Sequence, residues 1–249
     1  MIDLHSHILY GIDDGCKTIN DALKTILEMK NVGFNDIVLT PHFIDGSEYM
    51  ADNNLKFNLF NNLKKELSIN NTNVNLYLGN EVYINDHIVN LIKDNKIMSI
   101  NNSKYLLIEL PLNNEINMLE DYIHEIKVNG YIPVIAHPER YKYFKENYHK
   151  LNKLYNENVL FQCNYGSIIK QYGSDSYKLI KYMLKNNMVT FLSTDVHHPD
   201  SNVIRNFDKI KKKIIKIIGS DKFNDLSNNN ILKILKNQWN YWFFFVYLI

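Results

Sequence analysis

Short apolar runs alternate with amphipathic stretches along most of this chain. Seven of the runs have the length and the aliphatic, β-branched composition of buried strands, and they lie at 1–8, 36–42, 74–83, 104–110, 131–137, 158–164 and 188–198. Nearly continuous apolar runs are typical of parallel strands that are covered on both faces. The pattern therefore predicts a parallel sheet with helices packed against it.

The stretches between these runs carry the spacing of amphipathic helices. In the first, apolar residues recur at i, i+3, i+4 and i+7 after Thr18; Asp21 completes a capping box, and Gly33 ends the helix. Further helices are expected at 51–69, 116–130, 141–156 and 174–187, with a weaker one at 86–93. This β/α alternation, without a low-complexity linker, predicts one closed or nearly closed barrel; a doubly wound open sheet is the alternative.

Polar residues gather at the carboxyl end of every predicted strand. In chain order they are His5 and His7, His42, Glu81, Glu109, His137, Gln162 and Asn164, and Asp195 and His197. Barrel enzymes build their active sites at this end of the strands. A single loop histidine or helix-capping acid would have an ordinary structural explanation, but the whole set at one edge indicates a metal site. The other four histidines, His87, His124, His149 and His198, are expected at the surface.

The mixture of imidazoles and carboxylates indicates the kind of metal. It suits Zn²⁺, Mn²⁺ or iron better than Ca²⁺ or Mg²⁺ alone. Eight or nine ligands are too many for one ion, and a carboxylate such as Glu81 can bridge two. A cluster of ions about 3.5–4 Å apart is a common device for phosphoester hydrolysis.

Composition narrows the class of protein. The chain has 249 residues, 45% hydrophobic and 22% charged, with a formal net charge of +1. This describes a soluble globular protein and gives no indication of a nucleic-acid partner. Two cysteines, Cys16 and Cys163, and no visible signal peptide predict a cytoplasmic location. Neither cysteine begins a Cys-x5-Arg phosphate loop, so a thiol nucleophile is not expected.

Six ordered motifs resemble those of a known family. "DLHSHILYGIDDG", "TPHF", "GNEVY", "IEL", "AHPERY" and "STDVHH" are similar to the polymerase and histidinol phosphatase (PHP) family, and more narrowly to its bacterial tyrosine-protein phosphatases of capsular and exopolysaccharide loci. The resemblance implies a distorted (β/α)7 barrel and a trinuclear, often manganese-dependent site. It also implies a partner, a tyrosine autokinase with a tyrosine-rich tail.

The same resemblance implies roles for individual residues. One ion would be held by His5, His7, Glu81 and Asp195, and a second by Glu81, Glu109 and His137. The third would use His42, His197 and an aspartate of "DDG", with Asp14 favoured over Asp13. Arg140 would grip the substrate phosphate, for which a planar guanidinium is suited. Arg205 would be a second phosphate contact, but it lies about three residues later than the family pattern, so a helix-capping role is the alternative.

Other functions remain compatible with these residues. The same fold could act on a small phosphomonoester such as histidinol phosphate, or on a nucleic-acid phosphodiester. A metal-binding regulatory protein without turnover is a second class. An amidohydrolase barrel also begins with His-x-His, but it needs a histidine on strand six, where this chain has Gln162 and Asn164.

The C-terminal segment 239–249 is almost entirely apolar and aromatic. The barrel is expected to occupy 1–238, followed by this tail. Eleven residues of helix span only about 16 Å, too short to cross a bilayer. Packing against the barrel bottom or a second subunit is favoured over contact with the inner face of the membrane.

Overall fold

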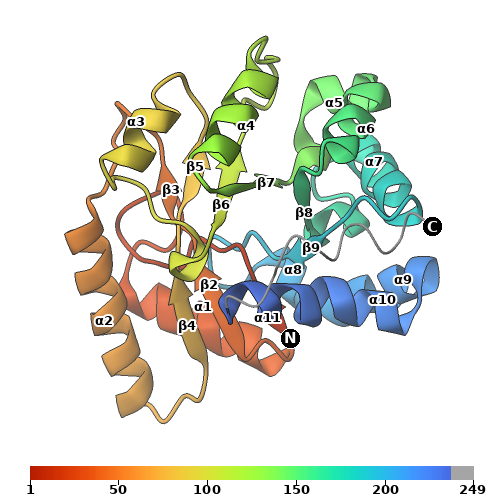
Figure 1. Cartoon of the computed structure of the whole chain (residues 1–249). Helices are drawn as coiled ribbons and strands as arrows, with labels where there is room; N and C mark the ends of the chain where they lie inside the picture. The colour runs from red at the N-terminus through yellow and green to blue at the C-terminus, as the bar shows by residue number, and fades with distance from the viewer. Residues whose placement is uncertain (237–249) are drawn as a thin grey trace.

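A computed structural model of the chain describes residues 1–236 and contains all seven predicted strand regions (Figure 1). The strands are β1 (Ile2–Asp3), β2 (Asp36–Leu39), β3 (His42–Phe43), β4 (Asn75–Leu78), β5 (Glu81–Tyr83), β6 (Tyr105–Glu109), β7 (Ile132–Ala136), β8 (Leu160–Asn164) and β9 (Phe191–Ser193). All of their pairings are parallel, in the orders β1-β2-β4 and β3-β5-β6-β7-β8-β9.

Two of the expected strands are interrupted without a change of register. Leu39 pairs with Leu78, and three residues later His42 pairs with Glu81. β2 and β3 are thus two halves of one barrel strand, as are β4 and β5. The first break falls at Pro41, which has no N–H to donate to a neighbouring strand. Each interruption directly precedes a residue predicted to bind metal.

The first and last strands close the sheet into a barrel. The backbone N–H of Asp195 donates to the carbonyl of His5 over 3.0 Å, and that of His7 donates to Val196 over 2.8 Å. Ser6 and Val196 also form a parallel bridge. The predicted (β/α)7 barrel is therefore confirmed, and the open-sheet alternative is wrong.

Helices connect the strands and cover the barrel. They are α1 (Ile19–Asn31), α2 (Asn53–Ile69), α3 (Ile88–Lys93), α4 (Leu119–Val128), α5 (Lys142–Glu146), α6 (Tyr148–Asn156), α7 (Ser174–Lys185), α8 (Asn202–Arg205), α9 (Phe207–Ile218), α10 (Ser220–Asn224) and α11 (Asn230–Leu235). The Thr18–Asp21 capping box of α1 is confirmed. The single helix expected at 141–156 is wrong: Asn147 adopts an extended conformation between α5 and α6, and its side chain caps α6.

The barrel interior is apolar at the end where the strands begin. One buried cluster joins first residues of strands, such as Ile2 and Phe191, to Ile231 and Ile234 of α11. Figure 1 shows α11 beside the N-terminus, at this end of the barrel. Apolar packing therefore stabilises the end of the barrel where the strands begin, and polar side chains occupy the carboxyl ends of the strands. The tail predicted at 239–249, and the end of the barrel region at 238, lie outside the described residues.

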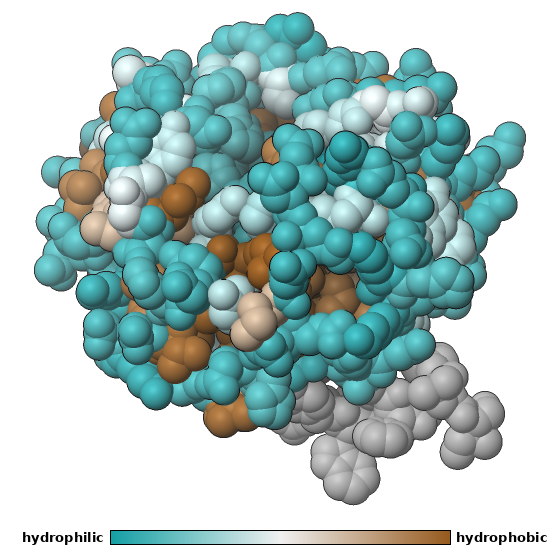
Figure 2. All heavy atoms as spheres, turned by 90° about the horizontal axis from the view of Figure 1, so that it is seen from above, coloured by the Kyte–Doolittle hydropathy of each residue, from teal (hydrophilic) through white to brown (hydrophobic). Residues whose placement is uncertain are grey.

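Figure 2 shows the molecule from above, turned by 90° from the view of Figure 1. Most of this face is hydrophilic, and apolar residues are visible mainly where the surface is hollowed. Within residues 1–236, no helix combines the length and the apolar character needed to cross a membrane.

Candidate metal centre

His5 and His7 bring two imidazole nitrogens together just beyond β1. Their Nε2 atoms are 3.1 Å apart, and each lies 3.2 Å from Oε2 of Glu81. Asp195 Oδ1 lies 3.5 Å from both nitrogens. All four side chains are buried. Ligands bound to one ion at about 2.0–2.1 Å are separated by about 3.0–3.4 Å, so this spacing suits a shared metal.

Glu81 lies at the centre of the cluster and presents each carboxylate oxygen to different histidines. Its Oε1 lies 2.9 Å from Nε2 of His137, and its Oε2 lies 3.1 Å from Nδ1 of His42. Glu109 reaches the same two histidines at 3.7 and 3.6 Å. A carboxylate with this arrangement could bridge two ions.

The outer part of the cluster is formed by Asp14, His42 and His197. Asp14 Oδ1 lies 3.5 Å from Nε2 of His42 and 3.6 Å from Nε2 of His197. The rings of His7 and His197 stack with centroids 4.1 Å apart, which brings His7 into the same group. The Asp14 side chain is half exposed, so this side of the cluster faces solvent.

Asp13 serves a different purpose from its neighbour. Its Oδ2 accepts hydrogen bonds from Nδ1 of His7 over 2.8 Å and from the backbone N–H of His42 over 3.0 Å. Its Oδ1 accepts from the N–H of Gly15. A carboxylate behind an imidazole fixes the ring and leaves the Nε2 lone pair for a metal. The position of Gly15 permits this turn, because a Cβ there would lie 1.9 Å from the carbonyl oxygen of His7.

Several buried polar atoms at the centre have no hydrogen-bond partner within residues 1–236. They include Glu81 Oε2, His42 Nδ1 and His137 Nδ1. Buried polar atoms are nearly always satisfied, so such atoms need an explanation. Glu81 Oε2 and His42 Nδ1 lie 3.1 Å apart and face each other without forming a hydrogen bond. A cation bound to Glu81 Oε2 would satisfy that oxygen, and the mixed imidazole and carboxylate donor set fits a transition metal.

The protonation states support the same interpretation. Burial and the charge of Arg140 lower the pKa of His137 to about 4, and burial and His7 lower the pKa of His197 to about 4. Neutral imidazoles are the form that binds metal. Against the effect of burial, the carboxylates of Glu81 and Asp195 instead raise the pKa of His5 to about 9, and those of Asp13 and Glu81 raise the pKa of His7 well above its usual range, so these two rings must lose a proton when a metal binds. Burial and the neighbouring Glu81 raise the pKa of Glu109 well above its usual range. Without a cation the neutral form of Glu109 is therefore favoured, and a bound metal ion would favour its ionised form.

Two residues of the cluster have strained backbones. His137 and Asp195 have φ values of 32° and 53°, in the left-handed region that non-glycine residues rarely adopt. Such strain is typical of functional sites held in place by the surrounding fold. At Asp195 the turn lets the backbone carbonyl accept a hydrogen bond from Nδ1 of His197 over 2.9 Å.

The two arginines lie in different surroundings. Arg140 donates to Asp195 Oδ2 over 2.9 Å, and its guanidinium lies 4.7 Å from the ring centroid of Tyr172. Arg205 ends α8, pairs with Asp200 over 3.2 Å and has a side chain that is 65% exposed. The structure therefore joins Arg140 to the cluster and places Arg205 on a surface ion pair.

The remaining histidines and both cysteines lie as expected. His87, His124, His149 and His198 are exposed. Cys16 and Cys163 are buried, and burial raises the pKa of the Cys16 thiol to about 11. Neither thiol is thus available as a nucleophile at neutral pH.

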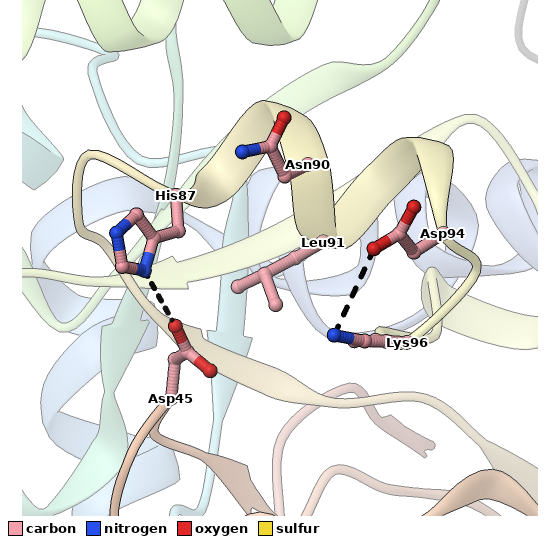
Figure 3. Close-up of a pocket in the computed structure, with 6 residues that line it drawn as sticks. All are labelled: Asp45, His87, Asn90, Leu91, Asp94 and Lys96. Carbon is pink, nitrogen blue, oxygen red and sulfur yellow. Dashed lines mark hydrogen bonds and ion pairs between the residues drawn. The ribbon is translucent and has the colours of Figure 1, made fainter.

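A pocket of about 290 Å³ lies near the loops that follow β3 and β5. Figure 3 shows its lining residues, in which His87 bonds to Asp45 over 2.8 Å and Lys96 pairs with Asp94 over 3.7 Å. Its charged side chains pair with one another, unlike the unsatisfied atoms of the metal centre.

Comparison with known proteins gives consistent matches over most of the chain. A family described as "Capsular polysaccharide synthesis, CpsB/CapC" matches residues 1–236. The chain is 38% identical to a putative tyrosine-protein phosphatase CapC of Staphylococcus aureus, over 79% of this chain and 77% of that protein. It is 30% identical to the tyrosine-protein phosphatase CpsB of Streptococcus agalactiae, over 96% of this chain and 100% of that protein.

A solved structure matches just as broadly. It comes from the crystal structures of YwqE from Bacillus subtilis and CpsB from Streptococcus pneumoniae, described as metal-dependent tyrosine phosphatases. The TM-score is 0.86 at 26% identity, covering 97% of this chain and 96% of the other.

Proposed function

This chain belongs to the CpsB/CapC family and is a metal-dependent tyrosine-protein phosphatase of capsular polysaccharide synthesis, and on that basis we propose how its residues bind metal and substrate. The observation that carries the proposal is the position of Glu81. Its two oxygens face different histidines, and its buried Oε2 has no hydrogen bond to any described residue.

Three neighbouring groups of side chains, two of which share Glu81, would hold the ions, which we propose to be Mn²⁺. The groups are His5, His7, Glu81 and Asp195; Glu81, Glu109 and His137; and Asp14, His42 and His197. The interatomic distances of 2.9–3.7 Å within these groups support the assignment. When bound, such ions lower the pKa of a bridging water and stabilise charge on the phosphate oxygens.

Arg140 is proposed to hold the substrate phosphate. Its guanidinium is anchored by Asp195 on one side and by the ring of Tyr172 on the other. An arginine fixed in this way keeps donors free for two phosphate oxygens and loses little freedom when substrate binds. Arg205, more exposed and paired with Asp200, is proposed as a second and weaker contact.

The substrate is proposed to be phosphotyrosine on the tail of a bacterial tyrosine autokinase. A flexible tail can reach a site that opens to solvent, and the half-exposed Asp14 marks such an opening beside His42 and His197. A location in the cytoplasm, where a kinase tail at the inner membrane face would be accessible, is part of this proposal.

Turnover of three substrates tests the proposal. A phosphotyrosine peptide, histidinol phosphate and a dinucleotide are each offered to the purified protein with and without Mn²⁺. We expect Mn²⁺-dependent release of phosphate from the peptide, with the highest kcat/KM of the three. Preference for histidinol phosphate would assign the chain to small phosphomonoesters, and binding of metal without any turnover would indicate a regulatory protein.

A further inference from the structure

β8 differs from the other barrel strands in ending with two amides. Gln162 and Asn164 lie two residues apart, so their side chains point to the same face of the strand. Both residues are fully buried. Amides are poor ligands for transition metals compared with imidazoles and carboxylates, so a different role must explain these polar groups inside the barrel.

The two amides form a continuous chain of hydrogen bonds from Asp195 to His5. Asn164 Nδ2 donates to Asp195 Oδ2 over 2.6 Å. Gln162 Nε2 donates to Asn164 Oδ1 over 2.8 Å. Gln162 Oε1 lies 2.8 Å from Nδ1 of His5 and completes the chain. Each link joins side chains that are buried, so water cannot replace it without disturbing the core.

The direction of this chain is fixed at its Asp195 end. An ionised carboxylate can only accept hydrogen bonds, so the NH₂ group of Asn164 must face Asp195. The carbonyl of Asn164 then faces Gln162, and this turns the NH₂ of Gln162 toward it. The carbonyl of Gln162 is left to face His5. His5 must therefore carry its proton on Nδ1, which leaves the Nε2 lone pair directed at His7 and Glu81.

The strand end that carries these amides is itself held in place. The backbone N–H of Asn164 donates to Oε1 of the buried Glu139 over 2.7 Å, and the Ser167 hydroxyl donates to the same oxygen over 2.8 Å. The backbone that carries the Asn164 amide is therefore held in place, in addition to the orientation of the amide itself.

We propose that Gln162 and Asn164 are positioning residues that transmit the charge of Asp195 to His5 and fix which nitrogen of His5 is free to bind metal. The idea rests on the proposed function for its premise that His5 and Asp195 bind metal. His7 and His197 are oriented differently, by the Asp13 carboxylate and by the backbone carbonyl of Asp195. Among the described contacts of the proposed ligands, His5 is the histidine whose ring nitrogen faces a neutral amide, and the orientation of an amide must be set by a further group.

Four substitutions test the direction of the hydrogen-bond chain. They are made in the full-length protein loaded with Zn²⁺, which is diamagnetic. Gln162→Leu and Asn164→Leu remove a link. Gln162→Glu still accepts from His5, and Asn164→Asp still accepts from Gln162. Gln171→Leu is the nearby control. Gln171 is exposed and donates to the Tyr172 hydroxyl, which also accepts from Asn164 Nδ2 over 3.4 Å, so this variant alters the surroundings of the hydrogen-bond chain without removing a link of it. The readouts are Zn²⁺ affinity by chelator competition and the NMR signal of the His5 Nδ1–H, which is protected from exchange only while hydrogen-bonded.

We expect both leucine variants to lose the His5 Nδ1–H signal and about 10–100-fold in affinity for one ion, the scale found when a group behind a metal ligand is removed. The Glu, Asp and Gln171→Leu variants should keep the signal. Asn164→Leu is decisive, because Asn164 does not bond to His5.

Retention of the signal and affinity in Asn164→Leu would overturn the proposal, as would loss of the signal in Gln162→Glu or Asn164→Asp. If the leucine variants do not fold, these two near-isosteric variants still decide the outcome. Failure of the proposed function is seen separately, as absence of phosphotyrosine turnover or of metal binding by the unmodified protein.

Discussion

His7 donates the hydrogen of its Nδ1 to Asp13 over 2.8 Å, and this bond separates the roles of two adjacent acids. Asp14 faces the histidines of the outer cluster instead. We expect Asp14→Ala to lose one ion per chain, and Asp13→Ala to keep the number of ions at saturating metal but bind them about 10–100-fold more weakly. Metal analysis after dialysis at two metal concentrations measures both effects. The reverse result would exchange the roles of the two acids.

Removal of metal should abolish activity, because the buried thiols offer no alternative nucleophile. Activity should disappear on chelation and return with Mn²⁺, whereas alkylating reagents should leave it unchanged under native conditions. Phosphate release from a phosphotyrosine peptide measures both treatments. Activity that survives chelation and is lost on alkylation would point to Cys16 and contradict the metal mechanism.

Arg140→Lys should retain the metal but lose about 10²–10³-fold in kcat, the scale for loss of one preorganised stabilising group. A lysine cannot present the planar pair of donors. Arg205→Ala provides the comparison, and we expect a smaller loss because Arg205 is exposed and paired with Asp200. Metal content should equal that of the unmodified protein in both variants. Loss of metal from Arg140→Lys would mean that Arg140 supports Asp195 rather than substrate.

Lys56 should make stability depend on alkaline pH. Its ammonium is buried, donates to Asn80 over 2.7 Å and lies 5.3 Å from the ring centroid of Phe43. Burial lowers the pKa of Lys56 from 10.5 to about 8. Between these values the unfolded chain binds a proton that the folded chain releases, so the free energy of unfolding rises with pH, by about 3 kcal/mol over the window.

Urea unfolding of metal-free protein between pH 7.5 and 10.5 measures this rise, with Lys56→Met as the control. The control removes the titrating amine, so its stability should lack this component of the pH dependence. Equal pH dependence in the two proteins would show that Lys56 keeps an ordinary pKa in the folded state.

Gly15→Ala should damage the metal centre through the backbone alone. A Cβ at this position would overlap the carbonyl oxygen of His7, so the turn that carries Asp13 and Asp14 must move. We expect loss of the outer ion and a lower melting temperature. Gly46→Ala is a useful comparison, since a Cβ there meets nothing within 4 Å, although its φ of +77° adds some strain. A fully metallated Gly15→Ala protein would show that the turn can relax.

One feature of the sequence predicted both the barrel and the cluster of histidines and carboxylates. Each apolar run ends in a polar residue, and parallel strands bring such ends to one edge, so His42 and Glu81 could be placed together before their pairing was known. The structure brings together every residue of the proposed ligand groups.

What the sequence did not predict depends on hydrogen-bond direction and local backbone geometry. Asp13 and Asp14 have identical side chains, and only the fold shows that one lies behind His7. Gln162 and Asn164 were visible as polar strand ends, but nothing in their identity indicated a connection between His5 and Asp195. The interruption of the helix at Asn147 was hidden because the apolar spacing continues across it.

The closure of the barrel also decides when the metal centre can form. His5 belongs to the first strand region and Asp195 follows the last, and the two are joined by a backbone hydrogen bond. Contacts between residues so far apart in sequence form late in folding, because a long loop must close before they gain anything. During synthesis, the early histidines emerge well before Asp195 and His197, so a nascent chain lacks the complete set of proposed ligands. Hydrolytic competence is therefore withheld until the last strand has joined the first.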